Sequence, residues 1–411
     1  MDYIIVGGGA SALSCAITLK REALRKSLDI RVRILEKNSS VGKKILATGN
    51  GRCNLTNMYM NKCFFNADAS LAALILDSFS TDDCISFFDS IGLKTASEEG
   101  RVYPLTFNAL SVLTLLIEEC ENLGVELITD TTVDSISKKD RFEISAHRTG
   151  ADNNDSEKQT FLADVCILAL GGKAAKIHGT DGDGYRILKA LGIRYNPIHP
   201  ALVQIKTEGT KTKPLHGVRV QGTIAIDGCG TETGEILFTD YGVSGIAAMQ
   251  LSGNVAEALS SEKKPIIHID LCPTMSKEEI VEYIKSRLKS NKGLSIGEAL
   301  LGIINPKLSR VLVEGQEALE LATAIENTAT QIKDFSLVAK DTNGYKNAQV
   351  TRGGVPSSEL LEGSLMAKAV DNLFITGELL DVDGMCGGYN LHFAWGSGIF
   401  AAKEAVKLAS N

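Results

Sequence analysis

The sequence predicts an α/β protein with a Rossmann-like FAD-type dinucleotide domain that is interrupted by an inserted domain, partly β and partly helical. The first observation behind this prediction is a βαβ unit at the amino terminus. An apolar strand at Tyr3–Val6 runs into a glycine-rich turn, and residues 13–24 then place apolar side chains mainly on one face of a helix. A second strand over 30–36 completes the unit.

Two further observations divide the chain. The pattern of expected secondary structure changes near Pro197. Beyond it, apolar and polar residues alternate over 218–227 and 235–239 around a glycine-rich turn, which is typical of antiparallel strands. The strand–turn–helix pattern of the first domain returns near the carboxyl terminus. A strand over 372–376 is followed by another glycine-rich turn and by a helix from about 390 to 408. The dinucleotide domain is therefore expected in two pieces, one at each end of the chain.

The expected domain boundaries lie where the pattern of secondary structure changes. The discontinuous domain is predicted over 1–192 and 347–411, with the insert over 193–346. Within the insert we expect a barrel-like β part, about 193–270 with 330–346, and a small helical part, about 271–329.

The remaining elements are expected from local patterns. Helices are predicted within 71–92 and at 110–122 and 182–191, and strands at 125–128, 132–137, 141–147 and 161–170. The polar stretch 149–158 is predicted to be a surface loop. In the insert, Ser276 and Ser295 each stand three residues before a glutamate, the capping-box spacing that starts a helix.

Composition and charge limit the functional classes. The chain has 411 residues, with 43 lysines and arginines against 50 aspartates and glutamates, a formal net charge of −7. This balance argues against nucleic acid or an anionic membrane as a partner. Nine cysteines occur without a C-x-x-C pair, which predicts scattered thiols and no metal site. No signal-peptide pattern or membrane-length apolar run is visible, so we expect a cytoplasmic protein.

The turn after the first strand has the pattern G-x-G-x-x-A, at Gly7, Gly9 and Ala12. Gly7 permits the tight turn, Gly9 allows close approach of a pyrophosphate, and Ala12 lets helix and strand pack closely. The amides at the start of the helix then bind the anion. Glu36, at the end of the second strand, is placed to accept hydrogen bonds from an adenosine ribose. The alternative is a glycine turn in an unrelated α/β protein.

Three further segments are typical of close approach between backbone and cofactor, although each also has a purely structural interpretation. Residues 42–57, rich in glycine, asparagine and cations, can wrap a phosphate and a polar ring edge. The strand within 164–172 ends in small residues. In 376–391, Glu378 can bind ribitol hydroxyls, and the helix after Gly388 can stabilise negative charge at N1 and O2 of a reduced flavin.

Together these segments resemble the HI0933-like flavoproteins of the two-dinucleotide-binding-fold superfamily. Members of that family have been described as aminoacetone oxidase-like or bile-acid reductase (BaiN)-like, NAD(P)- and FAD-dependent oxidoreductases. The resemblance covers essentially the full length and includes Gly182–Tyr185 and Val350–Val355. It implies non-covalent FAD in the discontinuous domain, with the insert on the substrate side. Ser11 stands where alanine is common, and a serine there still allows the pyrophosphate to approach.

The motifs and the resemblance together predict a set of cofactor-binding residues, without a catalytic acid or base. They are Gly7, Gly9, Ala10, Ser11, Glu36, Lys37, Gly42, Lys43, Lys44, Asn50, Gly51, Arg52, Cys53, Asn54, Val133, Ala169, Gly171, Gly172, Gly377, Glu378, Asp381, Gly388, Tyr389, Asn390 and Leu391. Arg352 is a further candidate near the ring. Tyr103, Tyr345 and His392 are possible acids, but a core or rim position is favoured for each of them.

The leading interpretation is an FAD-dependent oxidoreductase acting on a small organic molecule. Two reaction classes remain open: NAD(P)H-dependent reduction of a conjugated carbonyl compound, and oxygen-dependent oxidation of an amine or aminoketone. A second G-x-G-x-x-G after a strand is absent from the sequence, so NAD(P)H, if used, binds transiently in the shared cleft. A flavin-binding redox or RNA-modifying protein is the alternative. Its sequence support is one short basic cluster, Lys206, Lys211, Lys213 and Arg219.

Overall fold

The computed structural model describes residues 1–148, 158–316 and 318–410, and the chain divides into two compact units. Unit 1 comprises Met1–Ile198 with Val350–Asn411, and unit 2 comprises His199–Gln349. The insert expected over 193–346 thus begins and ends slightly before unit 2.

Unit 1 is built on a parallel sheet to which both ends of the chain contribute. The strand order is β20-β11-β1-β2-β7, and every pair is parallel. The strands are β1 (Asp2–Val6), β2 (Arg31–Leu35), β7 (Glu126–Ile128), β11 (Val165–Leu168) and β20 (Leu373–Ile375). All of β11 and all of β1 except Asp2 are buried, as expected for strands covered on both faces. Because all five strands run the same way, their carboxyl ends form one edge.

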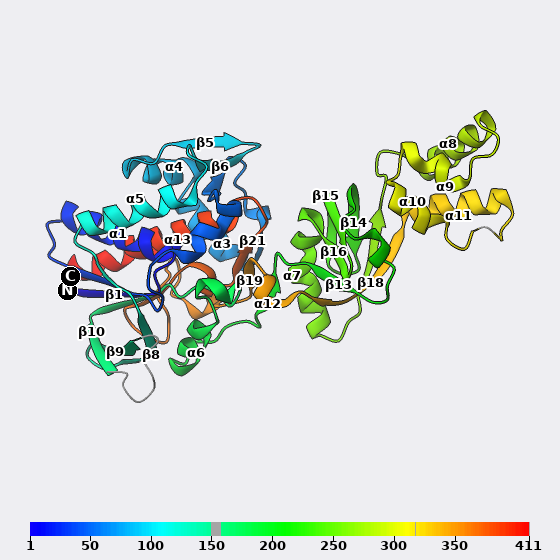
Figure 1. Cartoon of the computed structure of the whole chain (residues 1–411). Helices are drawn as coiled ribbons and strands as arrows, with labels where there is room; N and C mark the ends of the chain where they lie inside the picture. Colours follow the sequence, from blue (N-terminus) through cyan, green and yellow to red (C-terminus); the bar gives the residue numbers. More distant parts are fainter. Residues whose placement is uncertain (149–157, 317, 411) are drawn as a thin grey trace. The chain divides into compact units, whose positions relative to one another are not determined.

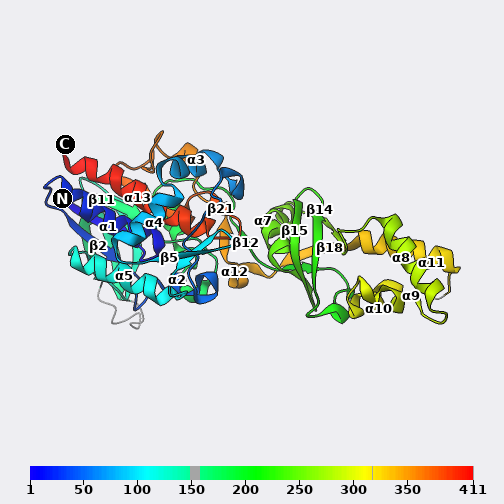
Figure 2. The same ribbon diagram turned by 90° about the horizontal axis from the view of Figure 1, so that it is seen from above.

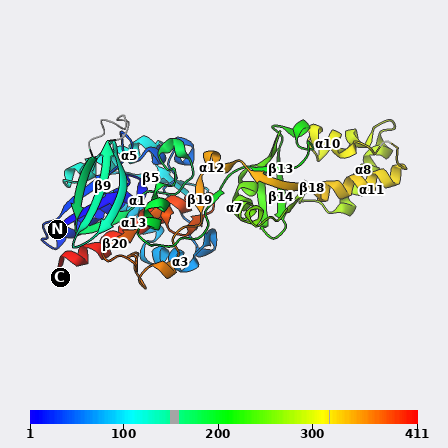
Figure 3. The ribbon, with the colours of Figure 1, turned by 90° about the horizontal axis from the view of Figure 1, so that it is seen from below.

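Helices cover one face of this sheet and a second sheet covers the other (Figure 1). α1 (Ala10–Arg25) and α13 (Tyr389–Ala405) lie side by side, and Ser14 Oγ donates to Trp395 O (3.1 Å) between them. α5 (Ala109–Asn122) lies next to α1 (Figure 2). The opposite face carries an antiparallel sheet (Figure 3), made of β8 (Thr131–Lys138), β9 (Phe142–Arg148) and β10 (Lys158–Ala163). This arrangement confirms the Rossmann-like α/β prediction.

Shorter elements complete unit 1. Its other helices are α2 (Lys43–Ala47), α3 (Ala69–Ser78), α4 (Thr81–Ser90) and α6 (Asp183–Ala190). Its other strands are β3 (Thr56–Asn57), β4 (Phe65–Ala67), β5 (Thr95–Glu98), β6 (Arg101–Pro104), β19 (Val350–Arg352) and β21 (Val382–Gly384). Of the loop expected over 149–158, all but Lys158 lies outside the described residues.

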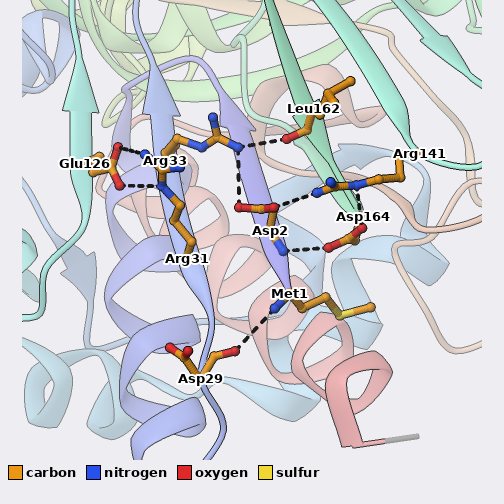
Figure 4. Close-up of polar contacts among 9 residues, drawn as sticks. All are labelled: Met1, Asp2, Asp29, Arg31, Arg33, Glu126, Arg141, Leu162 and Asp164. Carbon is orange, nitrogen blue, oxygen red and sulfur yellow. Dashed lines mark hydrogen bonds and ion pairs between the residues drawn. The ribbon is translucent and has the colours of Figure 1, made fainter.

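The continuous strand predicted over 161–170 is wrong. The chain forms β10, which pairs with β9, and then β11, which pairs with β1. Asp164 separates them, because its N–H donates to Asp2 O (2.9 Å) and its carboxylate accepts from Asp2 N (2.7 Å). Figure 4 shows this network at the amino-terminal end of β1, where Arg141 Nε lies 2.7 Å from Asp164 Oδ1 and Arg33 Nη2 lies 3.6 Å from Asp2 Oδ1. The partners of Asp164 thus tie the two sheets together.

Unit 2 contains a closed barrel with the strand order β13-β16-β15-β14-β17-β18. Its strands are β13 (Ile205–Thr207), β14 (Arg219–Ile226), β15 (Gly230–Thr239), β16 (Gly242–Ser244), β17 (Ile266–Asp270) and β18 (Phe335–Thr342). The rings of Phe238 and Phe335 are fully buried and pack edge to face, with centroids 5.7 Å apart. β14 and β15 form the antiparallel hairpin that the sequence predicts.

The rest of unit 2 is largely helical. It comprises β12 (His199–Ala201), α7 (Ile246–Ser260), α8 (Lys277–Ser290), α9 (Ile296–Ala299), α10 (Pro306–Val313), α11 (Leu321–Lys333) and α12 (Gly344–Asn347). Both predicted capping boxes are confirmed: Ser276 caps α8 with Glu279, and Ser295 caps α9 with Glu298.

Candidate cofactor site

The glycine turn after β1 leaves open space in front of α1. Gly7 has φ +99°, and its N–H donates to Leu35 O (2.8 Å). A Cβ on Gly7 would collide with the carbonyl of Ala169, so the turn requires glycine there. Gly9 is the N-cap of α1 and provides no side-chain cap, and a Cβ on it would meet nothing within 4 Å. The first amides of α1 therefore face space that a side chain or an anion can enter.

Glu36 follows β2 directly and is held in place by three donors. Its Oε2 accepts from Gly8 N (2.7 Å), and its Oε1 accepts from Asn38 N (2.8 Å) and Asn38 Nδ2 (2.6 Å). The residue is 8% exposed. A carboxylate offers roughly four acceptor positions, so the fixed Oε2 keeps capacity for one more donor, such as a ribose hydroxyl.

Glu378 brings the two ends of the chain together at the same edge of the sheet. It lies in a short 3-10 turn (Gly377–Leu379) just after β20. Its Oε2 accepts from Lys44 Nζ of α2 (2.6 Å), and its Oε1 accepts from Thr351 N of β19 (2.8 Å). A Cβ on Gly172 would come within 2.7 Å of Glu378 Oε1, so glycine is needed for this packing. Thr351 lies within the Val350–Val355 motif, in which the sequence assigned no individual role to this position.

The amino terminus of α13 is uncapped by any side chain. Gly388, the N-cap, has φ +98°, and a Cβ on it would lie 2.6 Å from Thr56 O and 2.8 Å from Asn54 Oδ1. Asn54 is 8% exposed, and its Oδ1 has no hydrogen-bond partner among the described residues. An unpaired buried amide oxygen is costly, which indicates a site that takes a further donor.

Asn390 has a structural role that the sequence did not predict. Its Oδ1 accepts from Gly384 N (2.8 Å) and its Nδ2 donates to Gly384 O (2.7 Å). Both ends of the amide are therefore engaged in bracing the glycine-rich loop that enters α13.

The segment after α2 is strongly curved. Gly49, Asn50, Gly51 and Cys53 all have φ between +55° and +82°. Left-handed non-glycine residues are costly and concentrate where function requires them. Within this segment, the Arg52 guanidinium lies 4.6 Å from the ring centroid of Tyr103, and its Nη1 lies 3.3 Å from Glu98 Oε2.

The other predicted residues lie along the same edge of the sheet or beside it. Gly42 N donates to Gly8 O (2.8 Å), and Thr131 N donates to Glu36 O (2.9 Å), which brings the start of β8, and with it Val133, close to Glu36. Lys37 Nζ contacts Asp181 and Asp183. The remaining predicted residues stand at the start of α1 (Ala10, Ser11), in α2 (Lys43), after β11 (Ala169, Gly171) and around the start of α13 (Asp381, Tyr389, Leu391).

Several groups that could carry protons are locked in neutral forms. His392 is fully buried between Thr56 Oγ1 (2.8 Å from Nδ1) and Phe79 O (3.0 Å from Nε2), and burial lowers its pKa to about 4. Burial raises the pKa of Cys53 to about 12 and that of Cys386 to about 11. These thiols stay protonated at neutral pH, so neither serves as a thiolate nucleophile. Tyr345, in unit 2, has its pKa raised to about 12 by burial.

Two buried carboxylates near the start of α13 have contrasting partners. Asp383 Oδ1 contacts Arg352 Nε (3.1 Å), and both side chains are less than a tenth exposed. Asp381 accepts from Asn196 Nδ2 through Oδ2 (2.6 Å), while its Oδ1 has no hydrogen-bond partner within the described part of the chain. Burial is the main cause that raises the pKa of Asp381, helped by the charges of Asp383 and Asp68.

This raised pKa predicts a pH-dependent effect of Asp381→Asn on stability. Ionisation of a buried acid with a raised folded pKa costs stability, and that cost appears above the unfolded pKa and grows until the folded pKa is passed. The stability of the variant relative to the unmodified protein should therefore rise from about pH 4, near the unfolded pKa, to neutral pH. Urea unfolding of the apoprotein across this range measures the effect, with Asp77→Asn, which removes an exposed ion pair with Lys62, as the control. Parallel pH profiles for Asp381→Asn and the unmodified protein would contradict the assignment.

Residues 1–148, 158–316 and 318–410 contain no cluster of histidine, cysteine and acidic side chains able to hold a metal ion. None of the helices in those ranges combines the length and apolar character needed to cross a membrane.

Comparison with known proteins places this arrangement in a family. Residues 1–404 match the HI0933-like protein Rossmann domain. The chain is 37% identical over 416 residues to the 3-dehydro-bile acid delta(4,6)-reductase of Clostridium scindens, with 98% of each chain covered. It is 27% identical over 424 residues to the ribosomal RNA dihydrouridine synthase of Escherichia coli, covering 100% of this chain and 99% of that one.

A solved structure has a similar fold. The FrdA subunit of Escherichia coli quinol fumarate reductase matches with a TM-score of 0.50 and 13% identity, over 100% of this chain and 70% of that one. At this identity the match speaks for the fold alone. The full-length family match and the relative at 37% identity establish that the chain belongs to the HI0933-like family.

Proposed function

We propose that this protein is an FAD-dependent oxidoreductase that reduces a carbon–carbon double bond conjugated to a carbonyl group in a small organic substrate. The observation that carries the proposal is the row formed by Gly9, Glu36 and Glu378 along the carboxyl edge of one parallel sheet. In such sheets ligands bind outside the carboxyl ends of the strands. The row has the order of groups that a dinucleotide requires: an anion cradle between two hydroxyl acceptors.

The residues of unit 1 fit FAD in particular. The open space beside Gly9 and the first amides of α1 suit the diphosphate. Glu36 suits the adenosine ribose and Glu378 the ribitol. The flavin ring is assigned to the region of Gly388 and Asn54, where an unpaired Oδ1 accompanies the uncapped start of α13. The residues predicted from the motifs and the resemblance are proposed to bind the cofactor non-covalently.

FAD held by these residues would supply hydride-transfer chemistry between a donor and the substrate. The amides at the start of α13 would stabilise negative charge on the reduced ring, because a helix amino terminus carries roughly half a positive charge. The neutral His392 fixes Thr56, whose carbonyl packs against Gly388, and so holds the start of α13 in place. Asn390 braces the loop before the same helix.

The two relatives support one reaction class. Both a delta(4,6)-reductase of 3-dehydro-bile acids and a dihydrouridine synthase, by the chemistry of their names, concern a double bond conjugated to a carbonyl. This favours reduction over oxygen-dependent oxidation of an amine or aminoketone. NAD(P)H is proposed as the donor and binds transiently. All nine cysteines are free thiols, in keeping with a proposed cytoplasmic location.

A second candidate substrate is ribosomal RNA, on the strength of the relative that is 27% identical over the full length. Charge weighs against it. The net charge is −7, and two of the four basic residues noted in unit 2 pair with acids: Lys206 contacts Asp341 (3.4 Å) and Arg219 contacts Glu235 (2.6 Å). Lys211 lies over the Phe335 ring (4.0 Å). Cations that already pair with carboxylates attract the phosphate groups of RNA only weakly.

Anaerobic reoxidation tests the proposed function. The protein is reduced with NADH or NADPH without oxygen, and then mixed with cyclic enones or with ribosomal RNA lacking dihydrouridine. In a separate arm, the oxidised protein is mixed with aminoketones and then with oxygen. We expect conjugated enones to reoxidise the flavin faster than any other addition. Reoxidation by RNA but not by enones would favour the second candidate, and fast reoxidation by oxygen after reduction by an aminoketone would favour the oxidase class.

The Glu36→Ala variant should bind FAD more weakly. Loss of a charged acceptor for a ribose hydroxyl should cost about 1–3 kcal/mol of binding free energy. Equilibrium titration of the apoprotein with FAD, followed by quenching of flavin fluorescence, measures this difference. Glu22→Ala, which removes an exposed pair with Arg25 on α1, is the matched control. An unchanged dissociation constant for Glu36→Ala would place Glu36 outside the site.

A further inference from the structure

The loop between β11 and α6, residues 171–182, is anchored at the adenosine end of the proposed site. His178 O lies 3.5 Å from Asn38 Nδ2, and a Cβ on Gly179 would collide with the same amide. Asn38 is the residue that donates twice to Glu36. The second half of the loop therefore packs against the group that fixes the ribose acceptor.

The first half of the same loop is anchored at the ribitol end. Lys173 N (2.8 Å) and Ala174 N (3.1 Å) both donate to Thr351 Oγ1. Thr351 N in turn donates to Glu378 Oε1 (2.8 Å). The loop thus runs from the neighbourhood of Glu378 to that of Glu36, and the diphosphate of FAD must cover the same interval.

Two ion pairs close the loop at its carboxyl-terminal end. Lys37 Nζ lies 2.8 Å from Asp181 Oδ1 and 3.0 Å from Asp183 Oδ2. The three side chains are between 23% and 37% exposed, so the pairs are partly shielded from water. Although burial opposes it, the hydrogen bonds to the two carboxylates raise the pKa of Lys37. The ammonium group is thereby committed to protein carboxylates.

The loop depends on such anchors because its backbone is intrinsically adaptable. Gly171, Ala175, Gly179 and Gly182 all have positive φ, between +60° and +98°. Glycine loses more conformational freedom on ordering than any other residue, so a loop of this composition is held by its contacts. The contacts with Asn38 and Thr351 are neutral, whereas the two contacts of Lys37 join charged groups.

We propose that Lys37 is a positioning residue that acts through Asp181 and Asp183 to latch loop 171–182 beside the diphosphate of bound FAD. This inference rests on the proposed function. It differs from the sequence-based expectation, which places Lys37 among the residues that bind the cofactor. The latch slows release of FAD, whereas direct binding would add attraction between Lys37 and the diphosphate.

A double-mutant cycle separates the two roles. Three variants are loaded with FAD: Lys37→Met, the double variant Asp181→Asn with Asp183→Asn, and the combination of all three. FAD release is followed by fluorescence after dilution into an excess of an FAD-specific apoprotein that captures the released cofactor. Lys37→Met and the double aspartate variant should each release FAD about tenfold faster than the unmodified protein. This is the effect expected from the loss of one charge-assisted hydrogen bond. The triple variant should release FAD no faster than either of these variants, and Lys37→Arg should restore slow release. Asp77→Asn, which breaks the exposed pair with Lys62, is the control.

Thermal unfolding of the apoproteins keeps the test specific, because the latch predicts similar melting temperatures for all of them. Additive effects, or Lys37→Met acting alone while the aspartate variants behave like the unmodified protein, would overturn the latch in favour of direct binding. Unchanged release in every variant would also overturn it. An unmodified protein that binds no FAD at all would instead overturn the proposed function, and the latch with it.

Discussion

Replacing Gly9 by glutamate should yield a folded protein that contains no flavin. Gly9 has φ −85° and ψ −165°, a backbone conformation open to any residue, and a Cβ there would meet nothing within 4 Å. The fold therefore tolerates a side chain at this position. FAD should not, because the carboxylate would occupy the space assigned to the diphosphate. Two like charges about 4 Å apart repel by on the order of 4 kcal/mol in a partly shielded site, which lowers affinity about a thousandfold.

The control for this variant is Ala69→Glu, at the exposed first residue of α3. It adds the same charge at the start of another helix and should leave flavin content unchanged. Flavin content is measured by absorbance after purification, and folding by circular dichroism and thermal unfolding. A Gly9→Glu protein with full flavin content would remove the turn after β1 from the cofactor site. A variant that fails to fold would show that Gly9 lacks the free space ascribed to it.

The second large effect is expected from Gly388→Val. A valine Cβ would come within 2.6 Å of Thr56 O and 2.8 Å of Asn54 Oδ1, closer than van der Waals contact allows. The residue also has φ +98°, a region that costs a non-glycine residue roughly 1–2 kcal/mol. The start of α13 must therefore shift. FAD occupancy should fall sharply, and any flavin that still binds should have a lower reduction potential.

Gly124→Val is the matched control for strain. Gly124 also has positive φ (+69°), and a Cβ on it would meet nothing within 4 Å. That variant should lose stability to a similar backbone penalty yet keep its flavin. Spectroelectrochemical titration measures the potential, and absorbance measures occupancy. If both quantities match the unmodified protein in Gly388→Val, α13 does not stabilise reduced flavin, and Lys44 or Arg52 remain as candidates.

The parts of the site that could be predicted from sequence are those whose chemistry is local. Gly7, Gly9 and Glu36 lie within one βαβ unit, where strand, turn and helix follow each other without interruption, and their positions in the structure match the motif. The barrel in unit 2 and the two capping boxes also follow from alternation and short-range spacing.

The parts that could not be predicted depend on partners distant in the chain. The split of the strand at Asp164 follows from Asp2 and Arg141, which hydrophobic patterning does not register. The ion pairs of Lys37 with Asp181 and Asp183 join segments about 145 residues apart in the chain, and local sequence patterns do not report such partners. By contrast, the core or rim position that the sequence favoured for His392 is confirmed, since this residue is fully buried.

The most direct test of the account is the identity of the chromophore in the purified, unmodified protein. The cradle of Gly9, Glu36, Glu378 and the start of α13 predicts a yellow protein with the absorption bands of oxidised flavin. Acid precipitation should release the flavin into the supernatant, because binding is non-covalent, and chromatography should identify it as FAD. A colourless protein that fails to bind added FAD, or one that binds FMN in its place, would contradict the central claim.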